Sequence, residues 1–172
     1  MSKIRNIALV LATATLSLGA LTLHAQQTTF RATLTGAAHV PEPVVTNATG
    51  ELELTLSPDG KTLSYKLAVK DLINAASADL HLGPPTANGP LVAKLFPRGG
   101  GAKTGSFNGV LAQGTITSSE LTGPLTGAPL SDLVEEMRAG NTYCNIHTND
   151  GKEPPNSGPG DYRLGEIRGQ IQ

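Results

Sequence analysis

Two neighbouring segments of the chain alternate hydrophobic and polar residues with a period of two. Residues 50–56 (GELELTL) place leucine at every second position, and residues 62–69 (TLSYKLAV) alternate in the same way. Such alternation is typical of a β-strand with one buried and one solvated face. Pro58, Asp59 and Gly60, between the two segments, favour a tight turn. The pattern therefore predicts an antiparallel hairpin.

Shorter strand patterns recur along the rest of the chain, separated by connections rich in glycine and proline. They cover residues 28–35, 77–82, 90–96, 105–111, 142–148 and 164–171. Many short strands with frequent turn signals are typical of an all-β sandwich or barrel. One short helix is predicted in SDLVEEMRAGN, with Ser131 as its N-cap and Gly140 as its stop. We expect this helix to lie across one end of the strands.

The N-terminal segment has the pattern of a secretory signal. Two basic residues precede an apolar run that ends at Leu23, and a small residue, Ala25, precedes a polar stretch. We therefore expect residues 1–25 to be a cleaved signal peptide. Residues 26–172 then form one domain that is secreted or periplasmic and has no stable membrane span after cleavage.

The charge balance excludes a nucleic-acid-binding role. The chain has 14 acidic and 13 basic side chains, two of the basic ones lie in the signal, and aromatic residues make up only 3%. Nucleic-acid binding needs a basic face for the phosphates and commonly uses aromatic rings for the bases. The expected partner is instead an unidentified extracellular protein or surface.

Residues 142–148 (TYCNIHT) hold the chain's single cysteine and one of its four histidines. In a strand, Cys144 lies on one face, whereas Tyr143, Asn145 and His147 lie on the other. An unpaired cysteine in such a position is typically a small buried hydrophobe, so we predict that Cys144 packs in the core.

Asp79 and His81 are two residues apart, so they share a strand face, and like His147 they precede a loop rich in glycine and proline. If the two strand ends meet, two imidazoles and a carboxylate converge, which is a donor set suited to copper or zinc. The alternative is that each histidine is an ordinary hydrogen-bonded or exposed residue. His147 and Asn145 would then tie the loop of residues 149–161 to the sheet.

Glu166 and Arg168 share one face of the last predicted strand. This pair can bind an anionic or polar partner, or the two residues can pair with each other or with the preceding long loop. Exposed ion pairs are common and individually weak. We therefore expect a structural role for both residues.

Four segments, in order, resemble the CHRD domain, a family named after chordin and widespread in secreted bacterial proteins. They are LTGAAHVPEPVVTNATGELEL, ADLHLGPPTANGPLVAKL, GNTYCNIHTNDG and GEIRGQI, and the resemblance spans Phe30 to Ile171. It implies an all-β, immunoglobulin-like (Greek-key) antiparallel sandwich, here with one short helix. It also implies a binding or scaffold role, since in chordin such domains belong to an extracellular antagonist of growth factors.

The resemblance also carries over single residues. The family strand typically reads A-H-I-H-x-G, in which His81 stands at the second histidine and Asp79 replaces the first. His147 stands at the histidine of the N-x-H-T pattern, with Asn145 and Tyr143 beside it. Two family-pattern histidines at strand ends favour the metal hypothesis for His81 and His147, whereas Asp79, in place of a further possible ligand, speaks against it.

Two functions are compatible with these observations. The first, which the sequence favours, is a secreted, non-enzymatic binding or scaffold module. The second is a copper or zinc site of His81, His147 and Asp79 that serves metal storage or superoxide-dismutase-like redox chemistry. No complete catalytic motif supports an enzyme. His39 stands where the family usually has glutamate, so we expect no role for it.

Overall fold

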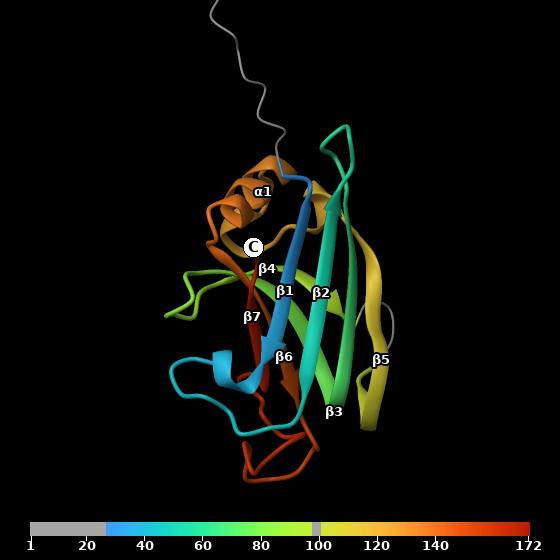
Figure 1. Cartoon of the computed structure of the whole chain (residues 1–172), viewed down its shortest axis with the longest axis vertical. Helices are drawn as coiled ribbons and strands as arrows, with labels where there is room; N and C mark the ends of the chain where they lie inside the picture. Colours follow the sequence, from blue (N-terminus) through green and yellow to red (C-terminus); the bar gives the residue numbers. More distant parts are fainter. Residues whose placement is uncertain (1–26, 98–100) are drawn as a thin grey trace, which may run out of the picture.

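The computed structural model describes residues 27–97 and 101–172, which form seven antiparallel strands, one α-helix and three short 3-10 helices (Figure 1). The strands are β1 (Thr29–Thr35), β2 (Thr49–Leu56), β3 (Leu63–Leu82), β4 (Leu91–Phe96), β5 (Lys103–Ile116), β6 (Thr142–Thr148) and β7 (Ile167–Gln170). The helix is α1 (Leu130–Arg138). The predicted signal peptide lies outside the described residues.

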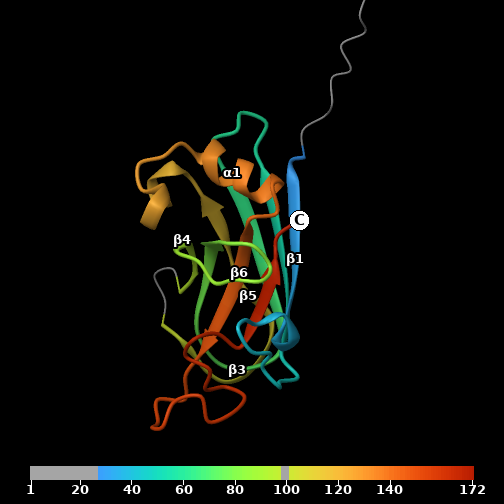
Figure 2. The ribbon, with the colours of Figure 1, turned by 90° about the vertical axis from the view of Figure 1, so that its left-hand side faces the viewer.

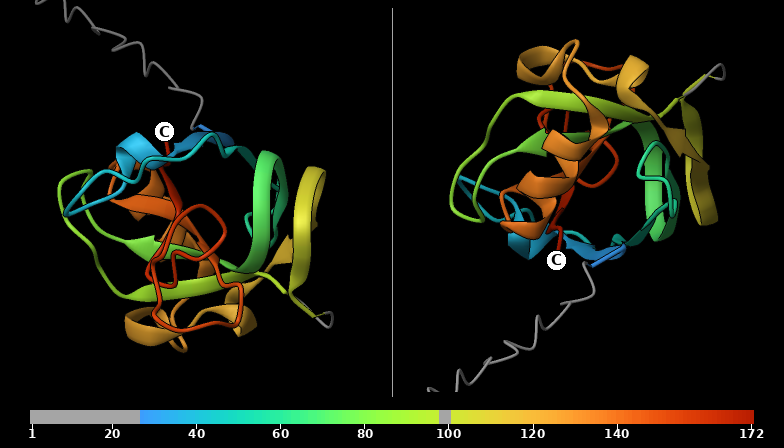
Figure 3. Two further views of the ribbon diagram at one scale, coloured as in Figure 1. Left: turned by 90° about the horizontal axis from the view of Figure 1, so that it is seen from below. Right: turned by 90° about the horizontal axis from the view of Figure 1, so that it is seen from above.

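Five of the strands close into a barrel. In the order β1-β2-β3-β6-β7 each strand is hydrogen-bonded to the next, and β7 returns to β1 through the pair Thr35–Arg168. Two reciprocal backbone hydrogen bonds of 2.9 Å between Arg31 and Gln172 complete this seam. Strands β4 and β5 extend the sheet from the other edge of β3. The closed ring is visible in both end views of Figure 3.

The predicted immunoglobulin-like sandwich is therefore wrong, although the all-β class is confirmed. A sandwich consists of two separate sheets packed face to face. Here β3 is 20 residues long. One edge of β3 pairs with β2 along the first part of the strand and with β6 along the second part. A single strand thus carries the pairing from one side of the molecule to the other. Period-two alternation is the same in a sandwich and in a barrel, so it does not reveal this closure.

The predicted hairpin of β2 and β3 is confirmed, but the two segments predicted as separate strands within β3 are continuous. The bend between them lies at Asp71 and Asn74, which have positive φ angles of 55° and 51°. The register between β3 and β5 shifts at the same place. Asn74 stabilises the bend with its side chain, because its Oδ1 accepts a hydrogen bond of 2.8 Å from the Gly105 N–H.

This bend decides which side chains of β3 face outward. Before it, the core side chains are odd-numbered, as Leu67 and Val69 are, whereas after it Ala78 and Leu80 pack in the core. Successive side chains of a strand alternate between its faces. Asp79 and His81 therefore point away from the barrel interior, which they would not do if the alternation continued unbroken.

Helix α1 lies across one end of the barrel, as predicted (Figure 3, right). Its inner side is formed by the buried residues Leu130, Leu133, Val134 and Met137. The predicted cap at Ser131 is wrong, because the cap is Pro129, two residues earlier, whose carbonyl accepts a hydrogen bond of 3.1 Å from the Asp132 N–H. Gly140, with φ of 68°, ends the helix as predicted. Among the described residues, no helix has the length and apolar character that a membrane span requires.

Three loops lie beside the outer face of β6 and β7, on the side turned toward the viewer in Figure 2. They are residues 36–48, which follow β1, residues 83–90, which join β3 to β4, and residues 149–166, which join β6 to β7. The polar side chains that the sequence singled out lie between these loops and the barrel wall.

Candidate metal centre

The β3–β6 ladder brings the predicted site residues to one place on the outer face of the barrel. Asp79 lies opposite Asn145, and Ser77 lies opposite His147. Residues opposite each other in antiparallel strands share a face of the sheet. His81, two residues beyond Asp79, shares it as well, so the two predicted strand ends do meet.

The three predicted ligands form a compact cluster. One ligand atom from each of Asp79, His81 and His147 lies within 4.8 Å of the other two. His147 Nε2 is 3.8 Å from Asp79 Oδ2, and the two imidazole centroids are 6.5 Å apart. Ligand atoms around a tetrahedral zinc ion lie about 3.4 Å from each other, so small side-chain rotations would bring all three onto one ion. His39 is not part of this cluster, and its Nδ1 lies 2.9 Å from the Glu42 carbonyl oxygen.

Each of the two imidazoles is oriented by a backbone carbonyl. His81 Nδ1 is 3.0 Å from the Gly89 oxygen, and His147 Nδ1 is 2.9 Å from the Arg163 oxygen. Because a carbonyl oxygen only accepts hydrogen bonds, each Nδ1 carries a proton and the Nε2 of the neutral ring keeps its lone pair. Burial lowers the pKa of His81 below its ordinary value of 6.5, so this ring is neutral at pH 7. A histidine that binds a metal through one nitrogen typically donates from the other in this way.

Several acceptor atoms at this place have no donor. Asp79 Oδ1, His81 Nε2 and Asn145 Oδ1 are buried and have no hydrogen-bond partner among the described residues. His147 Nε2 has a long contact of 3.5 Å with Asn145 Nδ2 and lies 3.8 Å from Asp79 Oδ2. Asp79 Oδ2 accepts one hydrogen bond, of 2.9 Å, from Ser77 Oγ. Buried polar atoms in proteins nearly always have partners, and a cation is the partner that carboxylate and imidazole lone pairs share.

Arg168, on β7, fastens the loop of residues 83–90. Its side chain is buried, and burial lowers the pKa of the guanidinium. It donates hydrogen bonds of 2.9–3.2 Å to three carbonyls of this loop, those of Pro84, Pro85 and Ala87. Gln170 adds a hydrogen bond of 2.9 Å to the Gly83 carbonyl. The loop that supplies the Gly89 carbonyl is therefore held from β7.

Tyr143 lies between this arginine and the metal cluster. The Arg168 guanidinium carbon is 3.9 Å from the centre of the Tyr143 ring, and that ring stacks on His81 with centroids 5.0 Å apart and an interplanar angle of 11°. The Tyr143 hydroxyl accepts a hydrogen bond of 2.9 Å from the Gly89 N–H. Tyr143 therefore supports both the His81 ring and the residue whose carbonyl orients it.

Glu166 fastens the two other loops. Its Oε1 accepts from Thr46 Oγ1 at 2.6 Å, and its Oε2 accepts from Thr148 Oγ1 at 2.6 Å and from the Gly160 N–H at 2.8 Å. The described contacts include no ion pair between Glu166 and Arg168, which are 0% and 2% exposed. Of the alternatives that the sequence left open for this pair, the described contacts include the one between Glu166 and the preceding long loop, at Gly160.

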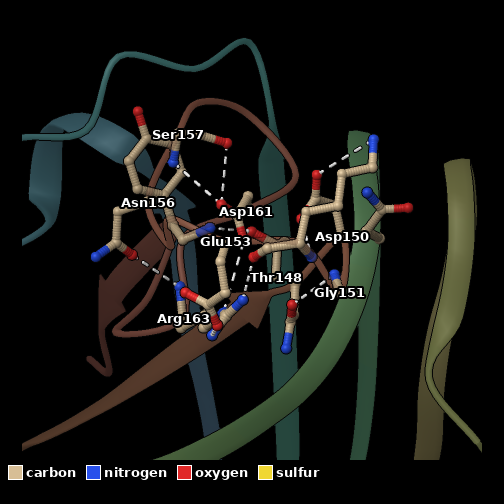
Figure 4. Close-up of polar contacts among 12 residues, drawn as sticks. Thr148, Asp150, Gly151, Glu153, Asn156, Ser157, Asp161 and Arg163 are labelled. Atoms are coloured by element: carbon tan, nitrogen blue, oxygen red, sulfur yellow. Dashed lines mark hydrogen bonds and ion pairs between the residues drawn. The ribbon is translucent and has the colours of Figure 1, made fainter.

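The loop of residues 149–166 is held internally around Arg163 (Figure 4). The guanidinium donates to Glu153 at 2.7 Å and to the Lys152 carbonyl, and its Nε lies 3.7 Å from Asp161 Oδ1. Asp161 accepts hydrogen bonds from the backbone N–H and the hydroxyl of Ser157, which hold its pKa below the ordinary value of 3.8. These contacts keep the Arg163 carbonyl beside His147.

Cys144 takes no part in the site. It is fully buried among core residues on the opposite face of β6, as predicted. Burial raises the pKa of its thiol far above the ordinary value of 9.0. A protonated thiol in the core is neither a metal ligand nor a nucleophile.

The sequence did not indicate the groups that orient the site. They are the carbonyls of Gly89 and Arg163 and the hydroxyl of Ser77. A backbone carbonyl has no side-chain signature, so only the positions of the two loops reveal it. Ser77 had a weak signal, because it is two residues from Asp79 and so can share its strand face.

The fold and the cluster define this class of protein as an all-β barrel domain with three candidate metal ligands on its outer face. A family model described as the CHRD domain matches residues 30–155, and the chain belongs to that family. The match ends before Glu166 and Arg168, although these residues hold the loops around the cluster. No curated protein matches the chain.

Proposed function

We propose that this CHRD domain is a secreted metal-binding module in which Asp79, His81 and His147 bind one copper(II) or zinc ion. The observation that supports the proposal most directly is the absence of donors: in the described structure, Asp79 Oδ1 and His81 Nε2 are buried acceptors without partners. His147 Nε2 lies beside them, 3.8 Å from Asp79 Oδ2. One bound cation would satisfy all of these atoms at once.

The donor set favours copper(II) or zinc. Two imidazole nitrogens and one carboxylate oxygen suit both ions, whereas copper(I) prefers thiolate and thioether sulfur. The only cysteine, Cys144, faces the core. Three protein ligands would leave one position for water or a small exogenous ligand, an arrangement that is typical of exchangeable or catalytic ions and not of closed structural sites.

A purely structural role for His147 and Asn145 explains less. Both do bond the long loop, because His147 bonds the Arg163 carbonyl and Asn145 donates to the Leu164 carbonyl at 3.2 Å. These bonds account for His147 Nδ1 and Asn145 Nδ2. They give no reason for a second imidazole and a buried carboxylate to face the remaining nitrogen of His147.

The test is a titration of tag-free residues 26–172 with zinc and with copper(II), followed by calorimetry or by competition with a chelator. We expect one ion per chain. His81→Ala and His147→Ala should each weaken binding by 100-fold or more, and Asp79→Asn should weaken it by about 10–100-fold, since each removes a donor.

The matched control is His39→Ala, which removes a histidine that lies outside the cluster. It should leave both the affinity and the stoichiometry unchanged. The proposal fails if the wild-type chain binds neither ion, or if His39→Ala weakens binding as much as His81→Ala does.

A further inference from the structure

We infer that Glu166 and Arg168 are the positioning residues of the site, each fastening one loop whose carbonyl orients one imidazole. The effect on metal affinity rests on the proposed function, whereas the effect on the imidazoles does not depend on any metal. Both residues belong to the short segment GEIRGQ at the start of β7. The two histidines lie on two other strands.

The first arm runs from Arg168 to His81. Arg168 binds three carbonyls of residues 83–90. Farther along the loop, the Asn88 side chain donates to the Val40 carbonyl at 2.8 Å and the Gly89 N–H donates to the Tyr143 hydroxyl at 2.9 Å. The Gly89 carbonyl then accepts the Nδ1 proton of His81. If Arg168 loses its bonds, the bond from Gln170 to the Gly83 carbonyl still ties one end of the loop to β7, but the part that carries Gly89 is held less firmly. The acceptor that sets the orientation of the His81 ring should then become less well placed.

The second arm runs from Glu166 to His147. Glu166 holds Thr148, at the end of β6, and Gly160, in the middle of the long loop. The Thr148 hydroxyl also accepts a hydrogen bond of 2.9 Å from the Tyr162 N–H. The next residue, Arg163, supplies the carbonyl that accepts the Nδ1 proton of His147. Glu166 therefore holds the segment that leads to Arg163, directly at Gly160 and through Thr148 at Tyr162.

Both residues also contact residues 36–48, Arg168 at the Ala38 carbonyl (3.4 Å) and Glu166 at Thr46 Oγ1 (2.6 Å). The carbonyls that orient the two imidazoles nevertheless lie in different loops, so the effects on the two rings should separate. Loss of Arg168 contacts should disturb His81 and leave His147 in place, and loss of Glu166 contacts should do the reverse. A general loss of stability would disturb both rings together. This selectivity distinguishes a positioning role from a merely structural one.

The first experiment needs no metal. Nitrogen-15 NMR of metal-free residues 26–172 reports which imidazole nitrogen of each histidine carries the proton. In the wild type we expect the proton on Nδ1 of both rings. Arg168→Lys keeps the charge but loses the planar fork, and it should shift only the His81 signals toward a mixture of tautomers. Glu166→Gln, which replaces one acceptor oxygen by an amide donor, should shift only the His147 signals.

Milder variants keep the test decisive if a buried charged residue proves essential for folding. Tyr143→Phe removes the hydroxyl that bonds Gly89 but keeps the ring, and Thr148→Val removes the hydroxyl that bonds Glu166 and Tyr162 but keeps the shape. They should reproduce, at smaller amplitude, the His81 and the His147 effects respectively. The inference is overturned if either pair of variants changes both rings equally or changes neither.

The second experiment measures zinc affinity against stability. Loss of an orienting group around a metal ligand typically costs 10–100-fold in affinity, so we expect that range for Arg168→Lys and Glu166→Gln. The control is Tyr65→Phe, which loses a buried hydrogen bond of 2.8 Å to the Leu95 carbonyl, away from the site. It should lower the melting temperature without changing zinc affinity.

The outcomes separate the two proposals. If zinc binds the wild type but Arg168→Lys and Glu166→Gln bind it equally well, the positioning role is wrong and the metal site stands. If no ion binds the wild type but the tautomer shifts are selective, the positioning role stands and the metal site is wrong.

Discussion

At the scale of the residue, Gly165 shows how closely the backbone approaches the site. It has a positive φ of 128°, a backbone angle that residues other than glycine rarely adopt. A Cβ atom at this position would lie 2.5 Å from both amide heteroatoms of Asn145. Asn145 in turn contacts His147 and the Leu164 carbonyl. The absence of a side chain at residue 165 therefore helps to place Asn145 beside the cluster.

Gly165→Ala should lower the free energy of unfolding by about 1–3 kcal/mol, because it combines backbone strain with a steric clash. The measurement is urea denaturation. Gly151→Ala is the matched control, since Gly151 also has a positive φ, of 79°, but has open space where the Cβ would lie. If both variants lose the same free energy of unfolding, the clash between a Cβ at residue 165 and Asn145 does not contribute to the loss.

At the scale of the element, the loop of residues 149–166 is a polar structure held by its own side chains. Asp161 is 2% exposed and accepts two hydrogen bonds from Ser157, while Arg163 bonds Glu153 and lies near Asp161. The loop has few apolar side chains, so hydrogen bonds and charge take the place of a core within it. Its order should therefore depend on pH.

The order of this loop should decrease in acid. The pKa of Asp161 is lowered in the folded chain, so the unfolded chain binds this proton more readily. The stabilisation is fully present above the unfolded pKa of 3.8 and is lost as the pH falls through the lower folded value. Asp161→Asn should weaken protection of the loop from hydrogen exchange at pH 7. It should also flatten the loss of protection that the wild type shows below pH 4.

Asp59→Asn is the control for this acid effect. Its carboxylate also has a lowered pKa, caused mainly by Ser57, but it lies in the turn between β2 and β3. Its effect on exchange should be confined to that turn. An equal effect of both variants on the long loop would contradict the role given to Asp161.

At the scale of the whole molecule, barrel closure depends on a narrow seam. Strands β1 and β7 share one ladder pair, Thr35–Arg168, and the seam continues through the Arg31–Gln172 hydrogen bonds. Between these, Ile171 is 0% exposed and bonds the Thr142 carbonyl through its N–H at 2.9 Å. Packing of this residue compensates for the short ladder.

Ile171→Ala should lower the free energy of unfolding by about 2–5 kcal/mol, since it removes a fully buried side chain from the seam. Chemical denaturation measures this loss. Val45→Ala is the comparison, because Val45 is 87% exposed and its loss should change stability by less than about 0.5 kcal/mol. A similarly small change for Ile171→Ala would show that the seam does not depend on this contact.

The sequence by itself determined the features that depend on neighbours along the chain. The β2–β3 hairpin, the burial of Cys144, the end of α1 at Gly140 and the CHRD family were all predicted and are confirmed. Each follows from a period of two, from a backbone angle that glycine tolerates, or from ordered motifs. These signals are local, so they can be recognised without knowledge of the fold.

Only the tertiary structure decided how the strands close and what surrounds the metal cluster. The bend at Asp71 and Asn74 turns β3 from β2 toward β6 and points Asp79 and His81 outward. Barrel and sandwich share the same alternation, so the sequence pattern does not distinguish them. The carbonyls that orient His81 and His147 come from loops remote in the chain, and a carbonyl is common to every residue. Long-range pairing, which no local pattern records, placed these groups together.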